Sequence, residues 1–547
     1  MYMNKQLTRR DFLKTVGVGS AALSLTTRST ANESKQDTSN HRWNILWISC
    51  EDTSPDLGCY GDEYADTPNL DRFAQQGCRY THAFVPYPVC APTRSAVITG
   101  MYPSTIGTMH MRTGMKGYEA VPPAQVKCFT EYLRAAGYYC TNNSKTDYQF
   151  KCPFTAWDDN GKQAHWRNRP AGKPFFSVIN LGVSHESRNW PKKNEKLIHE
   201  PNNVSVPPYY PDTPVVRENL ARYYDNVTKM DQQVGKILQQ LEQDGLAENT
   251  VVFFWSDHGR GLPRCKRWLY DSGIQVPLLV RWPGNNKAGT ICDDFVSLVD
   301  LGPTTLSVAG IPIPAYIQGK AFLGKQKVRS RECIIAGRER MDLNSDDHIR
   351  CVRDKQYKYI RNFMPDTPYA QPIPYRDKMP IMQEWRRLHA RGLLKDPQKR
   401  FMQDTKPPEE LYDITSDPHE IRNLAELTKY KNVLQRMRER LNQWIKKTGD
   451  LGGTPEEDLI ERMWPGRKQP VTAAPRIHIS KLNRNSVRVT ITCETEGASL
   501  GYRLDGTKKP WHLYSQPLEA KIGTRVIAKA IRIGYKPSKE VSVTIDF

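Results

Sequence analysis

Four short apolar runs in the first half of the chain are each followed closely by polar or charged residues. The runs are WNILWIS, YYCT, FFSVINLGV and VVFFWS, and the residues that follow them are Glu51, Asp52, Lys145, His185, Asp257 and His258. Apolar runs of this length predict buried strands. We therefore expect several strands that each carry chemically useful side chains just beyond one end.

Helical patterns separate these strands. PNLDRFAQQG and FTEYLRAAG predict short amphipathic helices, and a longer helix is indicated by apolar residues at three- and four-residue spacing, namely Leu220, Tyr224, Val227, Met230, Val234, Leu238 and Leu241. Strands that alternate with helices predict a mostly parallel α/β sheet, in which ligands bind beyond the C-terminal strand ends. The six polar residues should therefore meet at one edge of the sheet.

The stretch PVCAPTRSAVITG, residues 88–100, predicts a helix that begins near Cys90. Pro92 suits a first helical turn, and the unpaired N–H groups of that turn, the helix dipole and Arg94 together favour an anion. A thiol at a helix N-terminus ionises and oxidises easily. Cys90 is therefore either a reactive group at an anion site or a structural thiol.

The acidic residues at the strand ends would repel one another unless a cation lay between them. Glu51, Asp52 and Asp257 offer hard oxygen ligands, which suit Ca²⁺ or, less well, Mg²⁺. His258 would bind the same metal or contact the substrate anion. Each carboxylate alone would more often be a strand-end cap or an ion pair. Their convergence with Lys145 and the helix at residues 88–100 favours a shared site.

Five motifs, in order, resemble those of the sulfatase family of the alkaline-phosphatase-like superfamily. They are NILWISCED with the following TPNLDRFAQQG, VCAPTRSAVITGMYP, WSDHG, CKRWLYDSGIQVPLLVRWPG and ELYDITSDPHEIRNLA. The resemblance extends from about Trp43 to Gly449. A single C-x-P-x-R would be weak evidence, whereas five ordered motifs are strong.

The resemblance implies that a maturation enzyme converts Cys90 to formylglycine (3-oxoalanine), which acts as the nucleophile and lies at the metal. Arg94 would stabilise it, and Lys145 and Lys266 would act on the sulfate. Either His185 or His258 would protonate the leaving alcohol, and the other would help remove the remaining hydroxyl proton. The implied metal ligands are Asp52 and Asp257, with Glu51 and His258 at the two variable positions. This chain has TDYQF after Lys145, where many members have a histidine two residues on.

Two further segments could contact the substrate. His110 and Arg112, in MHMR, could bind a carboxylate or second sulfate of a sugar, or be solvated loop residues. Arg338, Asp342 and His348 lie in AGRERMDLNSDDHIR, where related sequences bring substrate-contacting groups to the pocket.

The chain should divide into several parts. We expect a catalytic domain, 43–330, with a large mixed, mostly parallel sheet flanked by helices, then a smaller α+β subdomain, 331–449. A linker, 450–474, leads to segments of period-two alternation that predict an antiparallel β-sandwich, 475–547. This last part resembles the C-terminal β domain of chitobiases and β-hexosaminidases. We favour a stabilising cap over a glycan-facing module.

The N-terminus, LTRRDFLKTVGVGSAALSL, resembles a twin-arginine export signal. We predict a signal at 1–31 and a linker at 32–42, hence transport by the twin-arginine translocase and a periplasmic or extracellular protein. The alternative is an uncleaved anchor or a disordered tail. No later segment approaches the roughly 18 apolar residues of a membrane helix.

Charge and cysteine content narrow the choice of partner. The formal net charge of +20 points toward a polyanion, and the chain has no nucleic-acid-binding motif. Its 12 cysteines show no repeating disulfide framework. We therefore predict a sulfatase that cleaves sulfate esters or N-sulfates of an anionic glycan. The alternatives are a phosphonate monoester or phosphodiester hydrolase and an inactive glycan-binding relative.

Overall fold

The computed structural model describes residues 42–546 except 192–195, 286, 344 and 507–509. The predicted export signal therefore lies outside the described residues. In the described part of the chain, none of the helices combines the length and the apolar character that a bilayer span requires. All 12 cysteines are free thiols.

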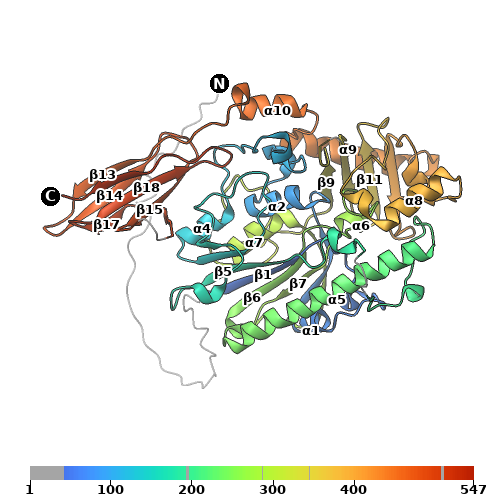
Figure 1. Ribbon diagram of the computed structural model, residues 1–547, viewed down its shortest axis with the longest axis horizontal. Coiled ribbons are helices and arrows are strands. Elements are labelled where there is room, and N and C mark those ends of the chain that lie inside the picture. Colours follow the sequence, from blue (N-terminus) through green and yellow to red (C-terminus); the bar gives the residue numbers. More distant parts are fainter. Residues whose placement is uncertain (1–41, 192–195, 286, 344, 507–509, 547) are drawn as a thin grey trace, which may run out of the picture. The chain divides into compact units, whose positions relative to one another are not determined.

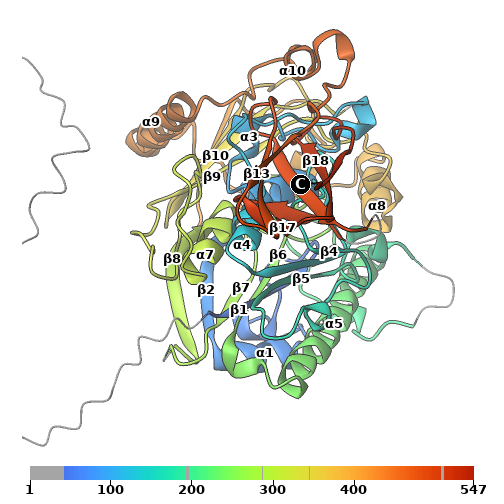
Figure 2. The ribbon, with the colours of Figure 1, turned by 90° about the vertical axis from the view of Figure 1, so that its left-hand side faces the viewer.

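The centre of the fold is an eight-stranded sheet in the order β4-β3-β5-β1-β6-β7-β2-β8. Strand β7 is antiparallel to both of its neighbours, and the other pairs are parallel. Figure 2 shows β8 at one edge of this sheet and β4 at the other. The strands span β1 Asn44–Cys50, β2 Cys78–Phe84, β3 Tyr139–Asn143, β4 Asp159–Asn160, β5 Phe175–Leu181, β6 Thr250–Ser256, β7 Leu278–Arg281 and β8 Thr290–Ser297.

Helices cover both faces of this sheet (Figure 1), with α1 and α5 on one face and α2, α4 and α7 on the other. The helices of this region are α1 Pro68–Gln76, α2 Cys90–Thr99, α3 Pro103–Ile106, α4 Phe129–Ala135, α5 Pro214–Gln243, α6 Asp271–Ile274 and α7 Leu301–Val308. Helix α5 begins at Pro214 because the Thr213 side chain accepts a hydrogen bond from the Val216 N–H. All seven apolar residues predicted for its inner face are buried.

A four-stranded antiparallel sheet, in the order β12-β11-β10-β9, forms the smaller subdomain. Its strands are β9 Ile334–Arg338, β10 Ile349–Arg353, β11 Tyr357–Asn362 and β12 Glu409–Asp413. Helices α8 Pro380–Ala390 and α9 Lys431–Thr448 flank it in Figure 1. Residues 450–474, expected as a linker, contain helix α10, Glu456–Met463, whose Glu456 Oε2 lies 2.6 Å from Arg340 Nε.

Two antiparallel sheets make up the C-terminal region, in the orders β13-β14-β17 and β16-β15-β18-β19. Their strands are β13 Arg476–Lys481, β14 Ser486–Thr492, β15 Ser499–Leu504, β16 His512–Tyr514, β17 Leu518–Lys521, β18 Arg525–Ile531 and β19 Val541–Thr544. The sheets share a core that includes Val487, Val489, Val526 and Ala528. The predicted fold class, with a mostly parallel sheet, an α+β subdomain and an appended β-sandwich, is confirmed.

Candidate active site

The strand register brings the predicted acidic residues together. Cys50, the last residue of β1, pairs with Ser256, the last residue of β6, so the residues after both strands emerge at the same edge. The backbone N–H of Asp52 donates to Asp257 Oδ1 at 3.2 Å. Both carboxylates are fully buried. The ends of two adjacent parallel strands therefore form the floor of the site.

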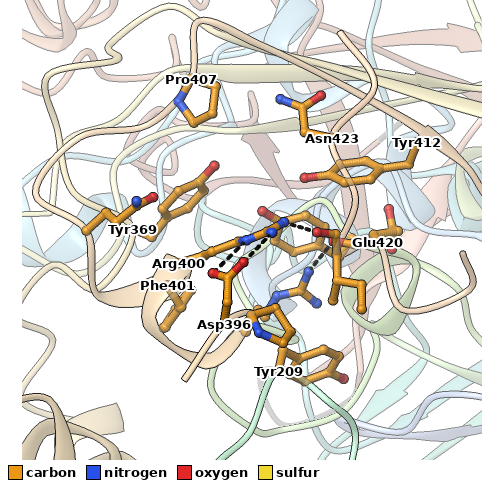
Figure 3. A pocket seen from close by; sticks show the side chains of 14 residues that line it. Tyr209, Tyr369, Asp396, Arg400, Phe401, Pro407, Tyr412, Glu420 and Asn423 are labelled. Carbon is orange, nitrogen blue, oxygen red and sulfur yellow. Dashed lines mark hydrogen bonds and ion pairs between the residues drawn. The ribbon is translucent and has the colours of Figure 1, made fainter. Parts of the chain in front are cut away.

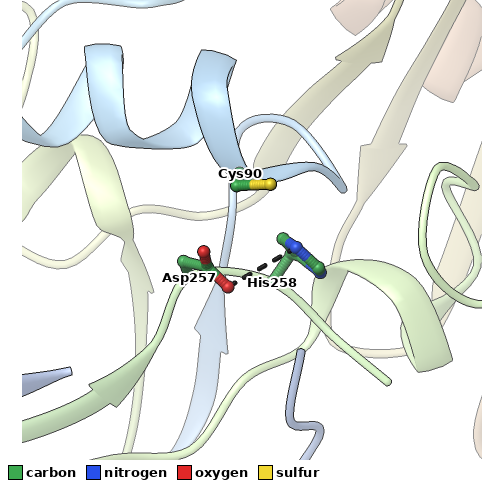
Figure 4. Close-up of side chains that lie close together, drawn as sticks. All are labelled: Cys90, Asp257 and His258. Carbon is green, nitrogen blue, oxygen red and sulfur yellow. Dashed lines mark ion pairs between the residues drawn. The ribbon is translucent and has the colours of Figure 1, made fainter. Parts of the chain in front are cut away.

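Cys90 is the first residue of α2 and lies beside the end of β6. Figure 4 shows its side chain close to Asp257 and His258. Ligand atoms of these three residues lie within 4.8 Å of one another, as do those of Glu51, Asp52 and His185. Val89, which precedes the helix, offers no side-chain cap to its first turn. The thiol, the helix N-terminus and the acidic floor are thus adjacent.

Two cations bind the floor from the side of α2 and β3. Arg94 donates from Nε to Asp257 Oδ2 at 3.2 Å and from Nη1 to Asn180 Oδ1 at 2.7 Å. Lys145 Nζ lies 2.7 Å from Glu51 Oε1. Burial alone would lower the pKa of Arg94, but Asp257 and Glu51 raise it above its usual value. Both side chains therefore stay charged and fixed against the carboxylates.

A third cation approaches from the segment after β6. Lys266 Nζ lies 2.9 Å from Asp52 Oδ2 and 3.0 Å from Glu186 Oε1. Glu186 also binds Arg267 with both of its oxygens, at 2.8 and 2.9 Å. Burial raises the pKa of Glu186, but Arg267 and Lys266 lower it to about 2. Glu186 therefore holds Lys266 in place as a permanent anion.

The two histidines of the site have different surroundings. His258 is fully buried, and its Nδ1 lies 2.9 Å from the carbonyl oxygen of Gly259. Burial would lower the pKa of His258, but Asp257 and Asp52 raise it to about 10. The side chain of His185 is 16% exposed, and its Nε2 lies 3.9 Å from Glu51 Oε2. Burial and Lys266 lower the pKa of His185.

The buried imidazole of His258 tests whether these residues fit a metal ion. A carbonyl oxygen can only accept, so Nδ1 donates to Gly259, and Nε2 faces Asp52 Oδ1 at 3.0 Å and Asp257 Oδ1 at 3.5 Å. Without a metal, the raised pKa of His258 keeps the imidazole protonated between the two carboxylates. A divalent cation among these atoms would take the place of that proton, and a carbonyl oxygen that accepts from Nδ1 is usual for metal-binding histidines. The donor set therefore fits a divalent cation.

Sequence reasoning missed Glu186 and Asn180. Glu186 directly follows the predicted His185, and Asn180 is a polar residue inside the apolar run FFSVINL. Both positions carried a signal, because a charged or amide side chain in an otherwise buried segment needs a partner. The partners are Lys266 and Arg267 for Glu186, and Arg94 for Asn180.

Among the predicted substrate-contacting residues, Arg112 and Asp342 lie near Cys90 and its neighbours. The Arg112 side chain is 45% exposed, and its Nη2 lies 3.9 Å from Asp147 Oδ2. Asp147 is also 4.0 Å from Lys145 Nζ. Burial lowers the pKa of Arg112, but the negative charges of Asp147, Cys90 and Asp342 raise it above its usual value.

The other three predicted substrate-contacting side chains are engaged within the protein. Arg338 is fully buried and donates from Nε to Asp347 Oδ2 at 3.2 Å. His348 Nδ1 lies 3.1 Å from Glu339 Oε1. His110 is also buried and lies 3.9 Å from Glu456 of α10. Arg338 also donates from Nη1 to the carbonyl oxygen of Arg267 at 2.5 Å. Within the described residues, no ion pair joins any of the three to Glu51, Asp52 or Asp257.

Backbone strain concentrates around the site. Five of its residues have left-handed backbones, with φ of 57° at Asp52, 55° at Arg112, 53° at Asp147, 76° at Arg267 and 50° at Asp342. Such conformations are costly for residues other than glycine and persist only where the surrounding structure holds them. The loops that surround Cys90 are therefore fixed by their contacts.

The fold brings a helix N-terminus, three cations and an acidic floor to one edge of the sheet. A profile of the sulfatase family matches residues 43–169 and 162–311, and a profile described as N-sulphoglucosamine sulphohydrolase, C-terminal, matches 264–369. An ulvan-active sulfatase from Formosa agariphila is 43% identical over 550 residues, covering 92% of this chain and 91% of that protein.

Solved structures share the fold at low sequence identity. BT4656, in complex with its substrate D-glucosamine-2-N,6-O-disulfate, aligns with a TM-score of 0.56 and 16% identity over 76% of this chain and 99% of that chain. A phosphonate monoester hydrolase of Agrobacterium radiobacter aligns with a TM-score of 0.55 and 17% identity over 74% and 96%. At such identities these likenesses describe the fold alone.

The family profile and the 43% identical relative decide the assignment. The chain belongs to the sulfatase family and is a sulfuric ester hydrolase. The predicted resemblance and enzyme class are confirmed.

Proposed function

We propose that the protein is an exported sulfatase that removes sulfate from ester or N-sulfate groups of an anionic glycan, with formylglycine derived from Cys90 as its nucleophile. The position of Cys90 carries the proposal. It is the first residue of a buried helix, and its thiol lies within 4.8 Å of ligand atoms of Asp257 and His258. The relationship to an ulvan-active sulfatase supports a polysaccharide substrate.

The proposed chemistry assigns each cation a task. Formylglycine and a divalent cation, when in place, supply a hydroxyl nucleophile that can be regenerated and a Lewis acid for the sulfate oxygens. Lys145 and Lys266 balance the negative charge that grows on those oxygens. Arg94 stays bound to Asp257 and orients the residue at position 90. The first turn of α2 adds its free N–H groups.

His185 is the proposed acid that protonates the leaving oxygen; because its pKa is lowered, it would act as the minor, protonated form at neutral pH. It is partly exposed, whereas His258 is fully buried and held between a backbone carbonyl and two carboxylates. A proton donor must reach the substrate side of the reacting sulfur, and only the exposed ring can do so. His258 is assigned instead to the metal.

We propose Ca²⁺ as the metal, held by Glu51, Asp52, Asp257 and His258. Three carboxylates suit a hard cation with flexible coordination, which is more typical of Ca²⁺ than of Mg²⁺. Chelation should lower the rate of sulfate release at least about 100-fold, because the sulfate oxygens lose their Lewis acid. Added Ca²⁺ should restore the rate more fully than Mg²⁺ and should raise the melting temperature. An unchanged rate in the metal-free protein would refute the assignment.

Arg112 is proposed to bind a carboxylate beside the scissile sulfate, because it follows Met111, which packs in one cluster with Cys90, and its exposed guanidinium has only a loose ion pair with Asp147. Arg112→Gln should raise KM at least about tenfold on a sulfated oligosaccharide that contains a uronate, with kcat little changed. On the same oligosaccharide with its carboxylate reduced to an alcohol, Arg112→Gln and the wild type should have the same KM. Arg72→Gln, an exposed change on α1, is the control. An equal rise in KM on both substrates would exclude this role.

The remaining assignments concern transport and domain organisation. We propose that residues 1–31 direct export by the twin-arginine translocase to the periplasm or beyond, and that a maturation enzyme modifies Cys90. We also propose the domain boundaries 43–330, 331–449 and 475–547, with the β-sandwich as a cap. Lys127 Nζ donates to the carbonyl oxygen of Gly497 at 2.6 Å, and Arg532 Nη2 to that of Pro122 at 3.0 Å, which supports a packed rather than a free module.

The substrate class is tested by measuring released sulfate from ulvan-derived, O-sulfated and N-sulfated oligosaccharides beside 4-nitrophenyl sulfate. The proposal expects kcat/KM for at least one oligosaccharide to exceed that for the aryl ester. A preference for the aryl ester over every oligosaccharide would contradict the glycan assignment.

A further inference from the structure

A cavity of about 240 Å³ lies where the segment after β6 meets the smaller subdomain. Its walls come from four separate parts of the chain, including Tyr209 before α5, Tyr270 before α6, Tyr369 after β11 and Tyr412 on β12. Figure 3 shows the rings of Tyr209, Tyr369 and Tyr412 around its interior. No role in the sulfate site involves these residues.

A buried cation forms part of the cavity wall. Arg264 is 6% exposed, and its guanidinium carbon lies 4.1 Å from the ring centre of Tyr209 and 3.8 Å from that of Tyr270. Its one hydrogen bond within the described chain runs from Nη2 to the carbonyl oxygen of Glu420, at 2.7 Å. Within the described residues, no carboxylate lies at ion-pair distance from it.

The nearby carboxylates have other partners. Glu420 Oε1 lies 2.7 Å from Lys358 Nζ, and its Oε2 accepts from the backbone N–H of Asp271 at 2.5 Å. Asp396 binds Arg400 at 2.7 Å, as Figure 3 shows. Arg264 thus has a buried positive charge with no ion-pair partner of its own among the described residues; two tyrosine rings, the Glu420 carbonyl and the nearby Glu420 charge offset it in part. A buried charge without a direct counter-ion is costly. An anion in the cavity would balance it.

The rest of the wall suits a sugar. Aromatic rings provide flat apolar faces, and Gln403 adds an amide group that can donate to and accept from hydroxyls. Gln403 is exposed at the mouth of the cavity, whereas the tyrosines are buried. Few polar groups placed among aromatic walls are typical of small-ligand sites. The volume is below the usual range for drug-sized ligands, which favours a single sugar unit.

We propose that this cavity is a second binding site, separate from the sulfate site, for one anionic sugar residue, a uronate or a sulfated sugar, with its acidic group on Arg264. The choice of a sugar rests on the proposed glycan substrate. Lys266, two residues after Arg264, binds Asp52 in the sulfate site. One segment therefore supplies a cation to each site. A polymer held at both sites would gain affinity by local concentration.

Titration calorimetry with methyl β-glucuronide and, as the neutral match, methyl β-glucoside tests the proposal. Gln403→Trp fills the mouth without altering the buried wall, and Gln435→Trp makes the same change on the exposed face of α9. We expect the glucuronide to bind at least tenfold more tightly than the glucoside. Gln403→Trp should raise the Kd of the glucuronide at least tenfold, and Gln435→Trp should leave that Kd unchanged. A crystal soaked with glucuronide should show it against Arg264.

Three results would overturn the proposal: no binding of the glucuronide, equal binding of the two glycosides, or equal binding by the Gln403→Trp and Gln435→Trp proteins. Arg264→Met is a second variant, which should also lose binding of the glucuronide. If Arg264→Met does not fold, the comparison of Gln403→Trp with Gln435→Trp alone tests the proposal. Sulfate release from a short substrate is measured in parallel and should be unchanged in Gln403→Trp. A wild-type protein that releases no sulfate would refute the proposed function. The titration would still show whether the cavity binds the glucuronide.

Discussion

Replacement of Cys90 by serine is expected to reduce sulfate release at least about 1000-fold, the order of loss seen when an enzyme loses its nucleophile. A serine at this position keeps the size of the side chain but cannot serve as the substrate of the cysteine-modifying maturation enzyme. A serine that took up the sulfuryl group would hold it as a stable ester, whereas an aldehyde hydrate has a second hydroxyl with which to expel sulfate. The fold should be unaffected, because Cys90 forms no disulfide and serine fits among its apolar neighbours Val89, Ala91 and Met111 as well as beside Asp257 and His258.

The rate of sulfate release and the mass of the peptide containing residue 90 should be measured on protein made together with the maturation enzyme. Cys493→Ser, on the β-sandwich, is the matched control and should keep full activity. Full activity of Cys90→Ser would disprove the mechanism. A wild-type Cys90 that is never converted would instead favour the inactive glycan-binding alternative.

Asp257→Asn is expected to have the second largest effect. Asp257 accepts from Arg94 Nε and from the backbone of Asp52, and it faces the imidazole of His258. Loss of its charge should weaken metal binding by about 10- to 100-fold and kcat/KM by at least as much. It should also lower the free energy of unfolding by about 3 kcal/mol, because Arg94 becomes a buried cation with one less counter-ion.

A buried pair outside the site provides the control. Asp300 binds Arg331 and is 2% exposed, so Asp300→Asn should destabilise the protein in a similar way. It should leave the Ca²⁺ dependence of sulfate release unchanged. Urea unfolding and calcium titration of both variants separate the two effects. Equal calcium affinity in Asp257→Asn and wild type would remove Asp257 from the metal site.

The acidic floor could be predicted from sequence because it depends on backbone geometry. Residues that follow parallel strands emerge at one edge of the sheet, so Asp52 and Asp257 were expected at the same edge, and the pairing of β1 with β6 makes them neighbours. Lys145 and His185 follow β3 and β5 for the same reason. The helix at Cys90 was equally predictable from Pro92 and the residues after it.

Side-chain pairing could not be predicted in the same way. Arg338 was a candidate substrate contact because of its segment, yet its guanidinium is held by Asp347, nine residues further along the chain. His110 lies near Glu456, which is more than 300 residues away in sequence and belongs to a helix within a stretch expected as a linker. Such contacts depend on how separate parts of the fold meet, and neither periodicity nor spacing reports that.

The cavity around Arg264 was also beyond sequence reasoning. It is assembled from four separate segments, and none of its tyrosines forms a motif. Glu186 is an intermediate case, because its neighbour His185 was recognised but its two cationic partners lie some 80 residues further on. Local patterns thus predicted which side chains meet at this edge of the sheet, and tertiary packing determined what holds them.

The most direct test of the account compares, on one preparation with converted Cys90, the kcat/KM for sulfate release from a sulfated uronate-containing oligosaccharide with the kcat/KM for a phosphonate monoester and a phosphodiester. We predict that the sulfated oligosaccharide is turned over faster than both phosphorus substrates. Faster turnover of the phosphodiester or the phosphonate monoester would contradict the account.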